Sequence, residues 1–184
     1  TFNTSSDTEV LLNSFIEYGI DCIKQFIGMF AFSIYDKKKN ETFIVRDRLG
    51  IKPLYYFSND EKFIFSSEIK SILELENIER KLNINAVSSY LSFRYPILND
   101  TFFENIYSLA PAHYIKLSNE NTEIIEYWNV TDKFKEQKND KGEAYYLDTL
   151  KELLESSVKY RMIADVPFGA FLSGGVDSSV ITAL

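Results

Sequence analysis

The sequence predicts an α+β domain of layered sheet and helices over residues 1–130, followed by the start of a doubly wound α/β domain over 144–184. Three observations support this prediction. Short runs of aromatic and β-branched residues alternate with turn residues and helical patterns in the first part of the chain. A charged, exposed connector is expected at 131–143. A helical pattern, an apolar run and a glycine-rich loop then follow in the order of an α/β unit.

The first expected element is a helix at residues 8–18, where apolar side chains recur at helical spacing. Ser6 and Glu9 have the spacing of a capping box, which places Asp7 in the first turn. A second short helical segment is expected at 23–28.

Strands are expected next, because aromatic and β-branched runs are separated by short turns. They are 29–36, 42–47, the end of 49–58, and 62–67. Their short connections predict an antiparallel meander. Helices at 68–76 and 85–93 and a hairpin of 113–118 with 122–128 complete the first domain.

The second part of the chain begins with a long amphipathic helix at 145–162, where apolar residues recur every three or four positions. The continuous apolar run at 168–172 predicts a strand buried on both faces. The loop 173–179, SGGVDSS, comes directly after it, and a helix begins there.

This loop has the composition of a phosphate-binding turn. Paired glycines let backbone N–H groups point outward, and the following helix N-terminus adds positive potential. The loop is neither a Walker A motif nor a dinucleotide fingerprint, since both spacings are absent. Asp177 would repel a bare phosphate, so its presence favours a bridging divalent cation, Mg²⁺. The alternative is an ordinary turn made by Gly174 and Gly175, with Asp177 or Ser178 capping a helix.

Composition narrows the class of protein. A net charge of -7 argues against nucleic acid or an anionic membrane as the main partner. A single cysteine, no leader-like N-terminus and no run long enough to span a bilayer favour a cytoplasmic protein. Because Thr1 is not an initiator methionine, we expect a fragment or a processed product.

Several segments resemble one enzyme family. LSGGVDSS resembles the pyrophosphatase loop of ATP-dependent adenylating amidotransferases, and DVPFGAFLSGGVDSS resembles the glutamine-dependent asparagine synthetases. Upstream, SDTEVLL, GMFAFSIYD, RDRLGIKPLYY and FIFSSEIKSIL are similar to that family's glutaminase domain, in the family's order. The resemblance implies a truncated N-terminal-nucleophile glutaminase-type α+β domain, followed by the start of an α/β adenine-nucleotide-binding domain with an ATP pyrophosphatase loop.

The implied reaction uses two sites. One domain hydrolyses glutamine, and the ammonia travels through an internal tunnel. The second domain uses ATP and Mg²⁺ to adenylate aspartate and releases pyrophosphate, and ammonia then displaces AMP to give asparagine. Glutamine, aspartate and ATP are therefore the implied partners, with a possible homodimer of the complete protein.

The resemblance also assigns site residues. Asp7 matches the acid that holds the glutamine α-ammonium group, although an acid at a helix start has an ordinary structural role as well. Asp177 is implied as the Mg²⁺ ligand. The ATP-binding residues implied by the loop are Leu172, Ser173, Gly174, Gly175, Asp177, Ser178 and Ser179.

The family's nucleophile is an N-terminal cysteine, which this chain does not present. Thr1 is terminal, but the residues around it match an internal segment of the family, so we do not assign it as a nucleophile. Cys22 lies between apolar neighbours and is expected to pack as a small hydrophobic residue. We expect no catalytic residue within the chain, and neither glutaminase nor synthetase turnover by the chain alone.

Other residues are given structural roles. His113 is expected at a surface or edge position, and Arg46, Asp47 and Arg48 are interpreted as a local ion-pair turn. Two other functions stay open. One is a related amidotransferase with a different acceptor, such as a surface-polysaccharide sugar acid or the substrate of a β-lactam synthetase. The other is a non-catalytic scaffold domain.

Overall fold

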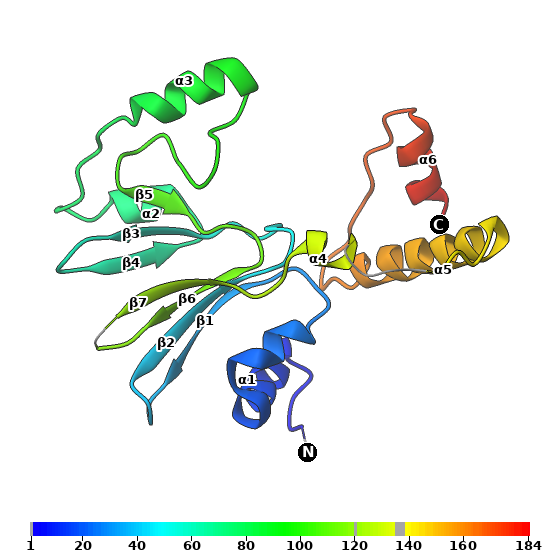
Figure 1. Ribbon diagram of the computed structural model, residues 1–184, viewed down its shortest axis with the longest axis horizontal. Helices are drawn as coiled ribbons and strands as arrows, with labels where there is room; N and C mark the ends of the chain where they lie inside the picture. Colours follow the sequence, from blue (N-terminus) through cyan, green and yellow to red (C-terminus); the bar gives the residue numbers. More distant parts are fainter. Residues whose placement is uncertain (1, 120, 135–138) are drawn as a thin grey trace. The chain divides into compact units, whose positions relative to one another are not determined.

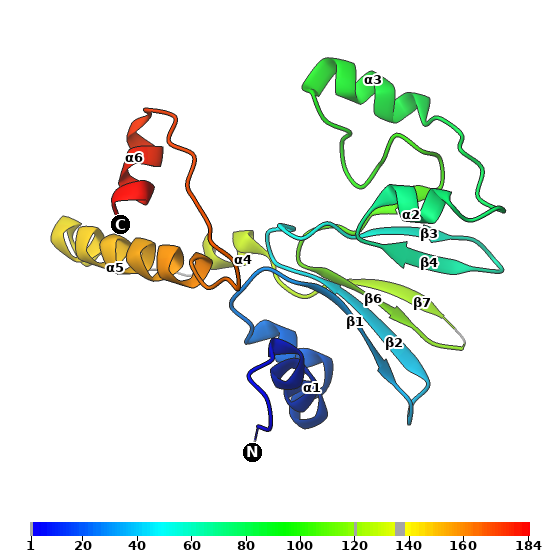
Figure 2. The same cartoon turned by 180° about the vertical axis from the view of Figure 1, so that it is seen from behind.

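The computed structural model describes residues 2–119, 121–134 and 139–184 (Figures 1 and 2). The chain forms two compact units, Thr1–Lys133 and Phe134–Leu184. The boundary between them falls within the stretch 131–143 that composition marks as a connector.

The first unit contains two antiparallel sheets. One has the strand order β1-β2-β6-β7, with β1 Ala31–Asp36, β2 Glu41–Arg46, β6 His113–Leu117 and β7 Thr122–Glu126. The other has the order β4-β3-β5, with β3 Tyr55–Ser58, β4 Phe63–Ser66 and β5 Ile106–Ser108. The α+β class predicted for this part of the chain is confirmed.

The predicted meander is wrong, although its four strands are present. The chain leaves the first sheet after β2 and enters the second sheet at β3, so β2 and β3 are not neighbours. The partner of β2 is β6, with Ile44 opposite Ile115. β5 was not predicted from the sequence, because a strand of three residues is too short to show a period of two.

Helices and sheets stack in four layers (Figure 1). Phe43 and Val45 of β2 pack against Cys22 and Ile23 beneath the helices, whereas Ile44 between them packs against Leu54 and Leu109 towards the second sheet. This alternation follows from the pleat of the strand, and it buries β2 on both faces. The helical layer on one side is α1 Asp7–Tyr18 with the 3-10 helix η1 Gly19–Lys24, and α2 Ile69–Leu73 covers the far side of the second sheet.

The start of α1 differs in part from the predicted capping box. Ser6 caps the helix, since its hydroxyl accepts a hydrogen bond from the N–H of Thr8 at 3.2 Å. Glu9 does not bond to the N–H of Ser6, as a capping box would require. Its carboxylate accepts instead from the N–H groups of Asn3 and Thr4, at 2.8 and 2.6 Å. The second helical segment also lies earlier than expected, at η1 rather than 23–28. Helix α3, Ile84–Phe93, is capped by Asn83.

The second unit contains the long helix α5, Glu143–Arg161, and helix α6, Val176–Ala183. The short helix α4, Val130–Phe134, crosses the boundary between the units and occupies part of the stretch predicted as a connector. The predicted strand at 168–172 is wrong, since the described part of this unit contains no strand that could pair with it. The side chain of Phe171 is fully exposed.

Among the described residues, no helix combines the length and the apolar character that crossing a bilayer requires.

Tyr127 joins the core of the first unit to the end of β2. Its ring packs against the cluster around Phe43 and Val45, and its hydroxyl donates to the carbonyl oxygen of Arg46 at 2.9 Å. Burial of the phenol raises the pKa of Tyr127 to about 12; the nearby Arg48 charge opposes this shift, and the Asp47 charge adds to it.

We expect Tyr127→Phe to lower the free energy of unfolding by about 1 kcal/mol, because the Arg46 carbonyl loses its partner. Urea unfolding near pH 7 measures this loss. Tyr35→Phe, which removes an exposed hydroxyl bonded to Asn40, is the control and is expected to have a smaller effect.

The difference between the unmodified chain and Tyr127→Phe is also expected to depend on pH. The unfolded tyrosine ionises near its ordinary pKa of about 10, whereas the folded one holds its proton up to about 12. The folded state therefore binds more protons in this window, and its stability falls as the pH rises through it. A difference that stays constant from neutral pH to pH values in this window would contradict the assignment.

Candidate functional site

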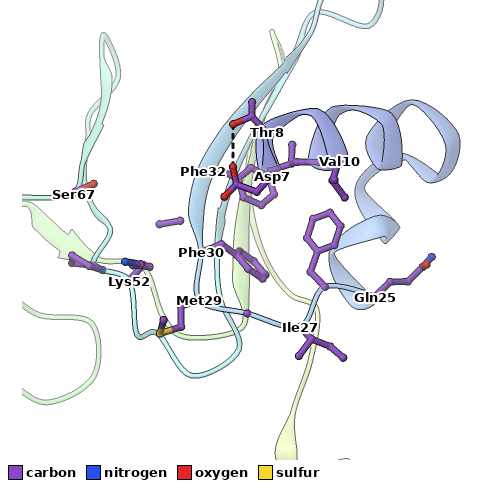
Figure 3. A pocket seen from close by; sticks show the side chains of 15 residues that line it. Asp7, Thr8, Val10, Gln25, Ile27, Met29, Phe30, Phe32, Lys52 and Ser67 are labelled. Carbon is purple, nitrogen blue, oxygen red and sulfur yellow. Dashed lines mark hydrogen bonds between the residues drawn. The ribbon is translucent and has the colours of Figure 1, made fainter. Parts of the chain in front are cut away.

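The first unit contains a cavity of about 680 Å³, a volume typical of small-molecule sites (Figure 3). The start of α1, the segment leading into β1 and the loop after β2 surround it. Its lining residues are Asp7, Thr8, Val10, Leu11, residues 25–32, Lys52, Pro53 and Ser67. Figure 3 shows Asp7, Thr8 and Val10 on one side, and Lys52 and Ser67 on the other.

Asp7 is the acid of this cavity that remains available to a ligand. It is the first residue of α1, is exposed, and accepts only a long hydrogen bond of 3.5 Å from the hydroxyl of Thr8 among the described contacts. The nearby acid Glu9 is already bonded to Thr4 and Asn3, and the Thr4 hydroxyl in particular lowers the pKa of Glu9. Asp7 therefore suits a cationic group in the cavity.

Asp47 shapes the loop that supplies Lys52 and Pro53 to the cavity. Its side chain is 1% exposed, and its carboxylate accepts three backbone N–H bonds, from Leu49 at 3.1 Å, Ile51 at 3.0 Å and Lys52 at 2.9 Å. These bonds turn the backbone tightly around the carboxylate. The conformation of this loop therefore depends on the buried carboxylate of Asp47.

The two arginines beside Asp47 bind backbone carbonyl groups. Arg46 donates to Lys52 and Gly50, both at 2.8 Å, and also to Leu109. Burial lowers the pKa of Arg46, and the adjacent Asp47 charge opposes this shift. Arg48 donates to the carbonyl oxygens of Lys24 and Phe26.

The ion-pair turn predicted for these three residues is therefore wrong, because among the described ion pairs none joins them. Their role is structural, as expected, but each charge is satisfied by backbone groups. Alternating charges in a sequence carry no signal that separates these two arrangements.

The glycine-rich loop of the second unit is held by its own serines. The hydroxyls of Ser173 and Ser178 lie 2.9 Å apart, and those of Ser178 and Ser179 donate to the carbonyl oxygen of Gly175 at 3.0 and 2.8 Å. Gly174 has a φ of 80°, and Gly175 caps α6. The structure therefore gathers the predicted serines and glycines around the start of one helix.

The donor set of this loop fits a phosphate group. Free N–H groups of a first helical turn are donors that such sites use, whereas the serine hydroxyls would have to leave their partners within the loop to donate to a phosphate. Asp177 and Leu172 are exposed, with Asp177 in the first turn of α6. No cluster of three metal-ligating side chains occurs among the described residues.

Other residues singled out in the sequence lie outside these sites. Cys22 is 1% exposed and packs in the core as predicted, where burial raises the pKa of its thiol. His113 begins β6, is partly exposed, and has its Nδ1 2.7 Å from the carbonyl oxygen of Pro111. Thr1 lies outside the described residues. Lys52 and Ser67 line the cavity, yet only their positions within the segments RDRLGIKPLYY and FIFSSEIKSIL could have indicated them.

The family profile described as a glutamine amidotransferase domain matches residues 1–128. The chain belongs to this family. A second profile, described as asparagine synthase, matches residues 149–184. These matches confirm the resemblance seen in the sequence segments.

Relatives at the level of whole sequences agree with the profiles. The chain is 41% identical, over 98% of its length, to a Methanocaldococcus jannaschii protein provisionally named glutamine-hydrolysing asparagine synthetase 2. It is 38% identical over its full length to the glutamine-hydrolysing asparagine synthetase 3 of Bacillus subtilis, and 34% identical to the amidase chry2 of Gibberella zeae. The chain spans 35%, 29% and 27% of these proteins, respectively.

The loop around Asp47 requires a residue without a side chain at position 50. This residue has a φ of 64°, and a Cβ atom there would lie 2.8 Å from Cγ of Pro111 and 3.2 Å from Cζ of Arg46. We expect Gly50→Ala to lower the free energy of unfolding by about 2 kcal/mol or more, through backbone strain and overpacking together.

Gly28→Ala is the matched control, because no atom lies within 4 Å of the added Cβ and the φ of Gly28 is not positive. It is expected to change stability by less than about 1 kcal/mol. Urea unfolding of both variants makes the comparison. Equal stability of the two would show that the loop adapts to a side chain at position 50.

Proposed function

We propose that this chain is part of a glutamine-dependent enzyme that joins ammonia from glutamine to a carboxylate activated by ATP, with aspartate as the acceptor and asparagine as the product. Residues 1–130 would form the C-terminal part of a glutaminase domain of the N-terminal-nucleophile type. Residues 144–184 would begin the ATP-dependent synthetase domain, with 131–143 as the connection. The observation that carries the proposal is the carboxylate of Asp7, which has no ion pair among the described residues and lines a cavity with room for an amino acid within a glutamine amidotransferase domain.

Asp7 would bind the α-ammonium group of glutamine. A charge-assisted hydrogen bond at this point would fix the backbone end of the substrate and so orient its side-chain amide. Cys22 is buried and does not line the cavity, so it is not proposed as the nucleophile.

The loop 173–179 would bind the phosphates of ATP through its hydroxyls and the N–H groups at the start of α6, with the backbone of Leu172 next to the nucleotide. Asp177 would hold Mg²⁺. ATP supplies an adenylyl group that converts a carboxylate into a good acyl donor, and the loop residues would stabilise the charge of the departing pyrophosphate.

A second candidate is a related enzyme that forms an amide on another carboxylate. The similarity to the amidase chry2, which extends over the whole chain, supports this second candidate. Supplying L-aspartate as the only acceptor separates the two, because asparagine appears in one case and not in the other. A cytoplasmic location is also proposed, from the single cysteine and the metabolic substrates. A homodimer of the complete protein is proposed from the family resemblance alone.

In the protein that carries this chain, we expect Asp7→Asn to raise the KM for glutamine by ~10–100-fold, the effect of losing one charge-assisted hydrogen bond. Synthesis from free ammonia is expected to be unchanged, because it bypasses the glutamine site. Steady-state kinetics with each nitrogen source measures both values.

Asp21→Asn is the control for this variant, because Asp21 is an exposed acid paired with Lys24 and does not line the cavity. Its KM for glutamine should match that of the unmodified protein. An unchanged KM in Asp7→Asn would remove Asp7 from the site and leave it the role of an acid at a helix start.

We expect Asp177→Asn to reduce ATP-dependent synthesis by at least ~100-fold, because a metal ligand would be lost, while glutamine hydrolysis is retained. Pyrophosphate release and glutamate release are the two measurements. Asp148→Asn, on the exposed surface of α5, is the control. Full pyrophosphate release by Asp177→Asn would rule out the metal-binding role.

A further inference from the structure

We propose that Asp47 and Arg48 are positioning residues for the glutamine cavity, each holding one of its walls in place. Neither residue lines the cavity, yet each bonds to the backbone of a segment that does. This inference rests on the proposed function, since it takes glutamine as the ligand of the cavity.

Asp47 holds the wall that contains Lys52 and Pro53. The N–H of Lys52 donates to Asp47 Oδ2 at 2.9 Å, and the carbonyl oxygen of Lys52 accepts from Arg46 Nε at 2.8 Å. The backbone of Lys52 is therefore held on both sides. The N–H of Asp47 itself donates at 2.9 Å to the carbonyl of Phe30, which also lines the cavity.

Arg48 holds the wall formed by residues 25–28. Its guanidinium group donates through Nη2 to the carbonyl of Lys24 at 2.6 Å and through Nη1 to the carbonyl of Phe26. These two carbonyls flank Gln25, and Phe26 leads into Ile27 and Gly28, all of which line the cavity. The rigid fork of an arginine fixes two acceptors in one relative position, which a single ammonium group does less well.

Both walls are held by residues that follow directly after β2. The residues that hold them are consecutive in the chain, and the strand before them is buried on both faces. The cavity walls are thus tied to the end of a strand that is buried on both faces. A shift of about 1 Å in a wall that orients a substrate is enough to change turnover by as much as ~100-fold.

The test uses Arg48→Gln and Asp47→Asn in the protein that carries this chain. Both are expected to raise the KM for glutamine by ~10-fold or more, while synthesis from free ammonia keeps its rate. Arg48→Lys is expected to restore part of the affinity, because one ammonium group replaces one of the two hydrogen bonds.

Two matched controls change side chains that bond to backbone groups away from the cavity. Arg80→Gln removes a guanidinium group bonded at 3.1 Å to the carbonyl of Leu73, and Asp36→Asn alters a carboxylate that accepts from the N–H groups of Lys38 and Lys39. Both controls should keep the KM of the unmodified protein. A KM in Arg48→Gln equal to that of Arg80→Gln would overturn the positioning role, and so would an equal loss of glutamine-dependent and ammonia-dependent synthesis.

Amide hydrogen exchange provides a readout that does not depend on activity. Arg48→Gln is expected to accelerate exchange of the amides of 24–28, and Asp47→Asn that of 49–52, with β2 and β6 unchanged. Unchanged exchange in both segments overturns the proposal. If Asp47→Asn does not fold, Arg48→Gln decides the result alone.

The failure of the proposed function gives a different result. In that case the unmodified protein itself does not hydrolyse glutamine, which overturns the positioning role for this substrate as well. If the unmodified protein hydrolyses glutamine and Arg48→Gln keeps its KM, only the positioning role fails.

Discussion

The structure of the first unit depends on a carboxylate that is almost completely buried and still satisfied. Burying an unpaired charge costs several kcal/mol in free energy, so Asp47 is tolerated only because Leu49, Ile51 and Lys52 each donate a backbone N–H to it. The residue also stands where three strands meet the loops. β2 ends beside it, the turn around it leads to β3, and its carbonyl accepts the N–H of Ala112 just before β6. The route of the chain between the two sheets follows from these contacts.

The parts of the fold that the sequence predicts are the local ones. The pairs β1 with β2, β3 with β4 and β6 with β7 are joined by short turns, and most of their strands are runs rich in aromatic and β-branched residues, so each was visible in a window of a few residues. The pairing of β2 with β6 and of β3 with β5 was not predicted, because nothing near Ile44 or Phe57 specifies a partner far along the chain. The apolar run at 168–172 has a strand-like composition, but a strand also needs a neighbour, and the described part of its unit supplies none.

In the candidate site, too, local features were predicted from the sequence and long-range contacts were not. Asp7 and the loop 173–179 were recognised because short segments around them resemble a family, and the structure places Asp7 at a cavity and the serines around one helix start. The supporting residues were misread, since Asp47 and Arg48 are charged and adjacent to each other. Their partners are backbone groups of segments at 49–52 and 24–26, and sequence carries no record of which carbonyl or N–H a side chain will find.

The pairing of β2 with β6 also has a consequence for biosynthesis. Ile44 and Ile115 are separated by about 70 residues, and the chain between them builds all three strands of the second sheet, so closing the first sheet requires a long loop to be ordered. At a synthesis rate of ~5–20 residues per second, the β1–β2 hairpin waits roughly 4 to 14 seconds on the ribosome for its partner. During this time the edge of β2 that pairs with β6 has no partner, and Ile44 lacks its core neighbours Leu109 and Ile115. An unpaired strand edge beside exposed apolar side chains is prone to aggregation while the rest of the chain is synthesised.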